Sequence, residues 1–184
     1  MKSGYESLKV MPNATTQEIK DAFRYLLFQY HPDHNKGRED WAVQQTMQLV
    51  EAYHVLSDPV RRAHHDLMRG VKLKEPPPLK KGLFSKPSEK TLAAEGYFKA
   101  GAERFRADEY EQAIVAFRKA FEADPDYPGL QYNLAIAFLG IERFNDALQW
   151  LQEHAGRNKE DQDARVLYTK IGGLMSKRKA AGVA

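Results

Sequence analysis

Residues 15–33 read TTQEIKDAFRYLLFQYHPD, and the architecture of the amino-terminal part follows from them. Thr15 and Glu18 have the spacing of a capping box, with Thr15 as the N-cap of a helix. Apolar residues then recur with helical spacing, at Ile19, Phe23, Leu26, Leu27 and Tyr30. Because proline disfavours helical geometry at the residue before it, the helix must end near His31. The stretch therefore predicts one amphipathic helix that stops at a proline.

The tripeptide His31-Pro32-Asp33 follows this helix directly. Pro32 fixes one backbone dihedral, which stiffens the exit from the helix. His31 and Asp33 are then displayed on a rigid corner, where the Asp33 carboxylate can accept a charge-assisted hydrogen bond from a partner's arginine. Such a corner is typical of an interaction site rather than of a core.

A second helix is predicted after the corner. Residues 33–37 are turn-forming, and residues 41–56 again carry apolar side chains on one face, namely Ala42, Leu49, Ala52, Tyr53 and Leu56. This run closes at Ser57-Asp58-Pro59, which also starts a short basic helix. Two antiparallel helices joined by a displayed loop, an αα-hairpin, are expected.

At these residues the chain resembles the J domain of DnaJ-type co-chaperones, over residues 4–68. The matching segments are Tyr5-Glu6-Ser7-Leu8, the 15–30 helix, His31-Pro32-Asp33, the 51–59 stretch EAYHVLSDP, and Arg62 with Asp66. A lone His-Pro-Asp is weak evidence, but its place after this helix and before this closure makes the resemblance specific.

The resemblance implies a function. J domains bind the ATP-bound form of a DnaK-type chaperone (the seventy-kilodalton heat-shock class) and stimulate its ATP hydrolysis. His31, Pro32 and Asp33 would trigger hydrolysis, and the preceding helix would dock through Lys20, Arg24 and Tyr25. The chain itself would be no enzyme and would have no catalytic residues.

The charge of the predicted J domain departs from this family. In residues 1–70 nine Lys and Arg balance nine Asp and Glu, and Tyr25 and Gln29 occupy positions where lysine is common. Weaker electrostatic steering is expected. The alternative is a tetratricopeptide assembly adaptor whose J domain is weak or inactive. Thr46 stands where the family normally buries a phenylalanine, so Met47 or Trp41 is expected to fill that space.

Composition limits the remaining possibilities. With 184 residues, 42% of them hydrophobic, the chain can form one or two packed domains. It has no cysteine, so a disulfide framework, a thiolate zinc site and a cysteine nucleophile are excluded. We expect no metal site and no cofactor. No apolar signal segment or membrane-spanning run is seen, which predicts a soluble cytoplasmic protein.

The positive charge is concentrated in one segment. Residues 71–91 hold six lysines and two glutamates, together with four prolines. This composition is typical of a semi-extended, solvated linker, and no interleaved aromatic residues support nucleic-acid binding. We predict a J domain at 1–70, a Pro/Lys-rich linker at 71–90 and a repeat domain at 91–184. Leu79, Leu83 and Phe84 are candidates to dock on a neighbouring surface.

A repeat of 34 residues follows the linker. The offset pairs Gly101 with Ala135, Tyr110 with Phe144, Ala113 with Ala147, and Phe117 with Leu151. This is the period of tetratricopeptide repeats, and the first unit, from Tyr97 to Pro125, resembles their consensus. A second unit at about 128–161 and a capping helix at 162–178 complete the domain. The predicted fold class is all-α: a J-domain helical hairpin followed by a short tetratricopeptide domain.

The resemblance also implies a partner groove lined by the first helix of each repeat. The predicted lining is mostly apolar and aromatic: Phe98, Ala102, Phe105, Tyr132, Asn133, Ile136 and Leu139. Of the Lys, Asn and Arg clamp with which some relatives grip acidic chaperone tails, only Asn133 is kept. An unknown partner protein with an apolar or helical segment is expected there, unless these residues belong to the core. We expect a monomer, with a dimer that completes the short array as the alternative.

Overall fold

Helices make up all the regular structure of residues 3–76 and 88–182, the part of the chain that this computed structural model describes. The predicted all-α class is confirmed. The chain divides into two compact units, Met1–Leu67 and Met68–Ala184. The two units are described separately below.

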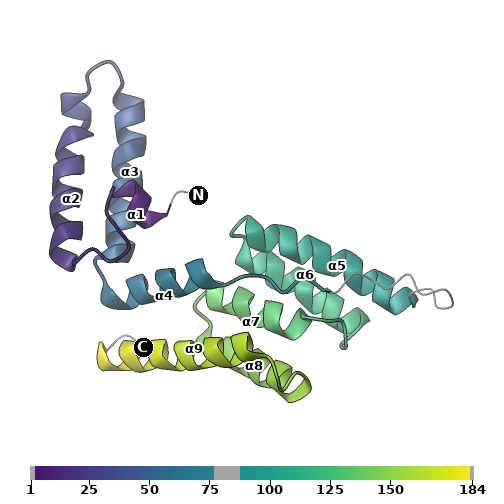
Figure 1. The fold of residues 1–184 in the computed structure, drawn as a ribbon. Helices are drawn as coiled ribbons and strands as arrows, with labels where there is room; N and C mark the ends of the chain where they lie inside the picture. The colour runs from purple at the N-terminus through teal and green to yellow at the C-terminus, as the bar shows by residue number, and fades with distance from the viewer. Residues whose placement is uncertain (1–2, 77–87, 183–184) are drawn as a thin grey trace. The chain divides into compact units, whose positions relative to one another are not determined.

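The first unit contains the predicted hairpin. A short helix, α1 (Gly4–Ser7), precedes α2 (Thr16–Gln29) and α3 (Glu39–Leu56), which form the antiparallel pair in Figure 1. The 3-10 turn η1 (Pro32–His34) lies between them, and α4 (Pro59–Gly70) follows. The capping box is confirmed, because the Glu18 N–H donates to Thr15 Oγ1 at 3.2 Å and the Thr15 N–H to Glu18 Oε2 at 2.7 Å.

The core of the hairpin is formed by the predicted helix faces. Phe23 of α2 and Tyr53 of α3 stack with ring centroids 4.2 Å apart. Both rings are partly buried and pack against the buried core. The buried members of this core come from α1, α2, α3 and the loop after α1: Tyr5, Leu8, Ala14, Ile19, Leu26, Leu49, Ala52 and Leu56.

Arg62 and Asp66, which the resemblance singled out, fasten α4 to α1. The Tyr5 hydroxyl donates to Asp66 Oδ1 at 2.8 Å and accepts from Arg62 Nε at 2.9 Å. Arg62 also donates to the Pro12 carbonyl at 2.9 Å. These residues therefore hold the base of the hairpin together.

The second unit is a stack of antiparallel helices. In chain order they are α5 (Glu89–Arg106), α6 (Tyr110–Ala123), α7 (Leu130–Gly140), α8 (Phe144–Arg157) and α9 (Gln162–Ala180), each packed on the next (Figure 1). α9 is the predicted capping helix, and it buries Ala164, Leu167, Ile171 and Leu174. A stack in which each helix contacts mainly its neighbours is typical of helical repeats.

The 34-residue period is also visible in the backbone. Asp108 and Glu142, 34 positions apart, both have left-handed backbone geometry, with φ of 60° and 57°. At each turn the following N–H donates back to a helix carbonyl at 3.0 Å, from Glu109 to Arg104 and from Arg143 to Phe138. The same turn thus joins the two helices of each repeat.

Two glycines allow close packing between helices. A Cβ atom on Gly101 would lie 2.6 Å from the Phe117 ring, and one on Gly140 would lie 2.5 Å from the Tyr110 ring. Any side chain at these positions would force the helices apart. The small residues of the repeat pattern therefore set the helix spacing.

Candidate functional site

The His31-Pro32-Asp33 corner is an exposed 3-10 turn. His31 is extended (φ −61°, ψ 135°) and serves as N-cap of η1, its Nδ1 accepting the Asp33 N–H at 3.2 Å. Asp33 Oδ2 lies 3.5 Å from the same His31 nitrogen, and the Asp33 side chain is 84% exposed. The tripeptide is thus ordered by its own hydrogen bonds while its carboxylate faces solvent.

Two side chains tie this turn to the ends of the helices. Asn35 Nδ2 donates to the carbonyls of Gln29 and His31, both at 2.9 Å. Thr46 of α3 donates to the Tyr30 carbonyl at 3.1 Å. Asn35 lies in the turn predicted at residues 33–37, where asparagine is favoured, whereas no role in supporting the loop was predicted for Thr46.

Thr46 thus has a polar role at a position where the family usually places phenylalanine. The expectation that Met47 fills this space is wrong, since Met47 is 65% exposed. Trp41 instead packs edge-on against the Tyr30 ring, with centroids 5.5 Å apart. The Thr46 hydroxyl therefore donates a hydrogen bond to the backbone, and Trp41 packs on the Tyr30 ring.

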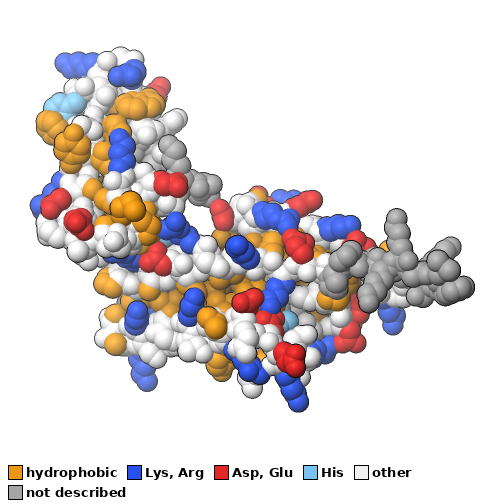
Figure 2. All heavy atoms as spheres, viewed as in Figure 1, with side chains coloured by type: hydrophobic (Ala, Val, Ile, Leu, Met, Phe, Trp, Pro, Cys, Tyr) orange, Lys and Arg blue, Asp and Glu red, His pale blue; other side chains and the backbone are white. Residues whose placement is uncertain are grey.

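The predicted docking residues Lys20, Arg24 and Tyr25 are all exposed on α2. Lys20 and Arg24 are one helical turn apart, so they share a face. Beyond them, Phe28 was missed by the sequence reasoning: it is 67% exposed and its ring lies 4.5 Å from that of His34. Figure 2 shows apolar side chains and a histidine grouped near the loop end of the hairpin, with Lys and Arg side chains at the tip.

The predicted groove lining needs a correction. Phe98, Ala102, Ile136 and Leu139 are buried in the stack, so they do not form the open apolar surface that was expected. Phe98, for example, packs on the rings of Phe117 and Tyr127 at 5.5 and 5.4 Å. The reason is the close helix spacing, which places the inner faces of α5 and α7 inside the core. Phe105 is half-buried against Tyr110.

Tyr132 and Asn133 have a different surrounding, because the chain's own residue 74 lies on them. The Asn133 side chain accepts the Lys74 N–H and donates to the Lys74 carbonyl, both at 2.9 Å. The Lys74 ammonium lies 4.6 Å from the centre of the Tyr132 ring and forms an ion pair with Asp161. We call Tyr132, Asn133, His154 and Asp161 the Lys74 site.

The electrostatics of the Lys74 site centre on Asp161. Burial raises the pKa of this carboxyl, but hydrogen bonds from Lys74, His154 and the Ala164 N–H outweigh burial and bring the pKa to about 2. Burial, with Asp163 and Asp161 nearby, raises the pKa of Tyr132 to about 12. At neutral pH the site therefore holds one fixed carboxylate against a neutral phenol ring.

Leu79, Leu83 and Phe84, the linker residues predicted to dock, lie outside the described residues. The boundaries 1–70, 71–90 and 91–184 stay predictions. Within residues 3–76 and 88–182 no three His, Asp or Glu side chains come together as metal ligands would. Over the same ranges, no helix is both long enough and apolar enough to cross a membrane.

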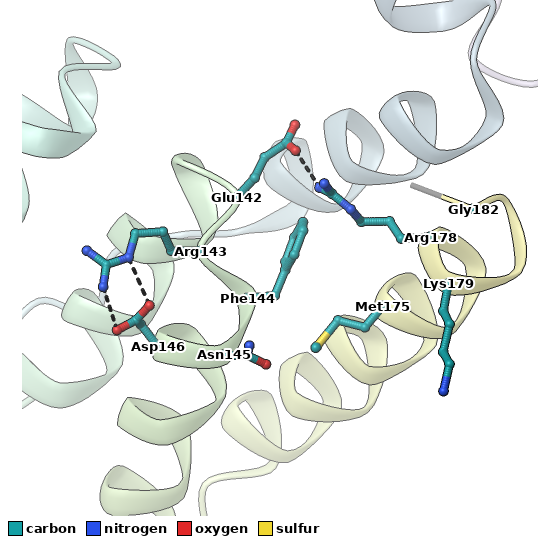
Figure 3. A pocket seen from close by; sticks show the side chains of 9 residues that line it. All are labelled: Glu142, Arg143, Phe144, Asn145, Asp146, Met175, Arg178, Lys179 and Gly182. Atoms are coloured by element: carbon teal, nitrogen blue, oxygen red, sulfur yellow. Dashed lines mark hydrogen bonds and ion pairs between the residues drawn. The ribbon is translucent and has the colours of Figure 1, made fainter. Parts of the chain in front are cut away.

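A pocket of about 640 Å³ opens between the start of α8 and the end of α9. Figure 3 shows two ion pairs on its wall, Arg143 with Asp146 at 2.8 Å and Glu142 with Arg178 at 2.5 Å. Phe144 and Met175 add an apolar surface. The charges of both arginines are matched within the wall.

Comparisons with known proteins agree with these two units. Residues 3–66 match the family model of the DnaJ domain, and residues 104–171 match that of the tetratricopeptide repeat. The chain is similar to the chaperone protein DnaJ of a Geobacillus species, at 52% identity over 62 residues, and to that of Dictyoglomus thermophilum, at 51% over 65 residues. These alignments cover 34% and 35% of this chain and 16% of each relative.

A longer alignment joins the chain to the meiotically up-regulated gene 184 protein of Schizosaccharomyces pombe. It has 38% identity over 95 residues, or 52% of this chain and 17% of the relative. The chain thus aligns with less than a fifth of the length of these relatives. No solved structure gives a significant match. The motifs, the helices and the two family models together identify a DnaJ domain at residues 3–66 and tetratricopeptide repeats at residues 104–171.

Proposed function

We propose that this chain is a co-chaperone whose His31-Pro32-Asp33 loop docks on a DnaK-type chaperone and stimulates its ATP hydrolysis. The observation that carries the proposal is the exposed, hydrogen-bonded loop at the end of α2, within a region that matches the DnaJ domain. The tetratricopeptide unit would bind a partner or client protein. The chain would catalyse nothing itself and would act by shifting the conformations that the chaperone populates.

The loop geometry supports this role. His31 holds the Asp33 backbone through its ring nitrogen, and the Asp33 side chain is 84% exposed. An exposed carboxylate can form a strong charge-assisted hydrogen bond with an arginine of the chaperone. The helix before the loop, α2, would add the docking face through its exposed residues Lys20, Arg24 and Tyr25. A cytoplasmic location and a monomeric state stay predictions.

The alternative is a tetratricopeptide adaptor with a weak or inactive J domain. It is favoured by one observation, the balance of nine basic and nine acidic residues in residues 1–70. On-rates rise with complementary charge, so a neutral J domain would meet its chaperone more slowly. The two functions differ in whether ATP hydrolysis responds to the loop.

Single-turnover ATP hydrolysis by the host's DnaK-type chaperones decides between them. We expect the wild-type chain to accelerate hydrolysis at least about tenfold, equal to about 1.4 kcal/mol of barrier. His31→Gln should abolish this effect. His34→Gln is the matched control, because His34 lies in the same turn but does not cap it. No acceleration by a folded wild-type chain with any host chaperone would favour the adaptor.

A further inference from the structure

The segment that follows α4 is held in the repeat unit as a bound peptide would be. Residues 71–76 have no helix or strand and belong to the same compact unit as α7 and α9. None of the six is buried, whereas Asn133 beneath them is fully buried. The site is therefore built from the core of the unit, and the segment lies on its surface.

Asn133 contacts residue 74 through backbone hydrogen bonds. Its amide bonds both the N–H and the C=O of Lys74, each at 2.9 Å. In the interior of an α-helix these groups are engaged within the helix. A segment at this position must therefore be extended, which excludes the helical partner expected from the sequence.

Gly129 adds to this backbone recognition. A Cβ atom on Gly129 would lie 3.0 Å from the Lys74 carbonyl oxygen, and Gly129 has a φ of +78° that favours glycine. The backbone of the segment thus approaches the turn before α7 more closely than a side chain at 129 would allow.

The remaining contacts of the site are with the Lys74 side chain. The Lys74 ammonium pairs with Asp161, lies 3.9 Å from Asp163 Oδ2, and sits over the Tyr132 ring. An aromatic face beside a carboxylate is a favourable site for a cation. His154 is 3% exposed and lies 2.7 Å from Asp161 Oδ2, so the carboxylate is oriented from behind.

We propose that the Lys74 site is the peptide-binding site of the tetratricopeptide unit. It would take an extended segment of a partner protein that presents a lysine. Residues 71–76 are its resident ligand, and the partner segment takes their place. The polar contacts and half-exposed side chains of the segment favour local release over a permanent role in the core.

This inference rests on the proposed role of the repeat unit in binding a partner. The resident segment is tethered, and tethering gives an effective concentration on the order of millimolar. A partner segment of equal affinity is therefore held off until it binds more tightly or the resident segment is weakened. In the absence of a partner, residues 71–76 would therefore occupy the Lys74 site.

The test uses a fluorescent synthetic peptide with the sequence of residues 70–76, GVKLKEP, and the full chain. Lys74→Glu in the chain places a carboxylate against Asp161 and Asp163, so the resident segment should leave. We expect this variant to bind the peptide at least about tenfold more tightly than the wild type does. A peptide with glutamate at the position of Lys74 should bind neither the wild type nor the variant.

Lys72→Glu is the matched control, because Lys72 lies in the same segment, is exposed, and undergoes the same change of charge. It should behave as the wild type. Equal peptide binding by the wild type and Lys74→Glu, or none by a folded Lys74→Glu chain, would overturn the proposal and make residues 71–76 a fixed part of the fold.

A second measurement needs no variant. The Lys74 amide donates to Asn133, so its hydrogen exchange in the wild type should be slow and should accelerate when unlabelled peptide is added in excess. Unchanged exchange at the highest peptide concentration would contradict displacement. ATP hydrolysis does not report on this site, so the proposed function and this inference can fail separately.

Discussion

At the scale of single residues, small side chains set how closely the helices of the repeat unit approach. Gly101 faces the fully buried Phe117 ring, and a Cβ atom there would lie 2.6 Å from it. Gly96 lies on the same helix, but nothing lies within 4 Å of a Cβ atom there. The same substitution at the two positions therefore separates packing from helix propensity.

We expect Gly101→Ala to lower the free energy of unfolding of the repeat unit by about 1–3 kcal/mol, because the added methyl overfills the contact. Gly96→Ala should raise it by about 0.5–1 kcal/mol, since alanine favours helix. Urea unfolding can be followed by Trp150 fluorescence in a Trp41→Phe background, because the chain has two tryptophans, one in each unit. Equal effects of both substitutions would contradict the close approach.

Asp161 gives a second prediction at this scale, for pH. Its pKa falls from 3.8 to about 2 in the folded chain, so its stabilising effect is present above pH 4 and is lost as the pH falls toward 2. The shift corresponds to roughly 2 kcal/mol. Between pH 5 and pH 2 the wild type should lose more unfolding free energy, by up to this amount, than Asp161→Asn, which keeps an N-cap oxygen for α9.

Asp163→Asn is the control for this measurement. Asp163 is 84% exposed and lies two residues further on, so its removal should leave the pH dependence close to that of the wild type. If Asp161→Asn and the wild type lost stability in parallel between pH 5 and pH 2, the Lys74 and His154 contacts would not stabilise the carboxylate.

At the scale of the elements, α2 carries the proposed docking face. Lys20 and Arg24 are exposed one turn apart, in a domain with no net charge. We expect Lys20→Ala with Arg24→Ala to raise the concentration needed for half-maximal stimulation several-fold, because the remaining complementary charge is lost. The effect should shrink as salt is added. Lys159→Ala with Lys170→Ala removes the same charge from the repeat unit and should change nothing.

The elements themselves were predictable from the sequence. The capping box at Thr15, the stop at Pro32 and the 34-residue period depend on neighbours within one or two turns, so local patterns report them. The burial of Phe98 and Ile136 was not predictable in this way, because it depends on how closely whole helices pack. The Lys74 site joins residues 59 and 87 positions apart, and no local pattern indicates such contacts.

At the scale of the whole molecule, each unit has a core of its own and one of the two proposed sites. The loop at His31 lies in the unit Met1–Leu67, and the Lys74 site lies entirely in the unit Met68–Ala184. No residue is shared between the two sites. Stimulation of the chaperone and binding of the peptide should therefore respond to different substitutions.

We test His31→Gln in the Lys74→Glu chain. This double variant should no longer stimulate the chaperone but should still bind the GVKLKEP peptide. Asn133→Ala should have the reverse effect in the same background, with stimulation kept within about twofold and peptide binding weakened tenfold or more, since both backbone hydrogen bonds are lost. Circular dichroism of each variant confirms folding. If a folded Asn133→Ala chain no longer stimulated the chaperone, the two sites would be coupled, and the bound state of residues 71–76 would control the J domain.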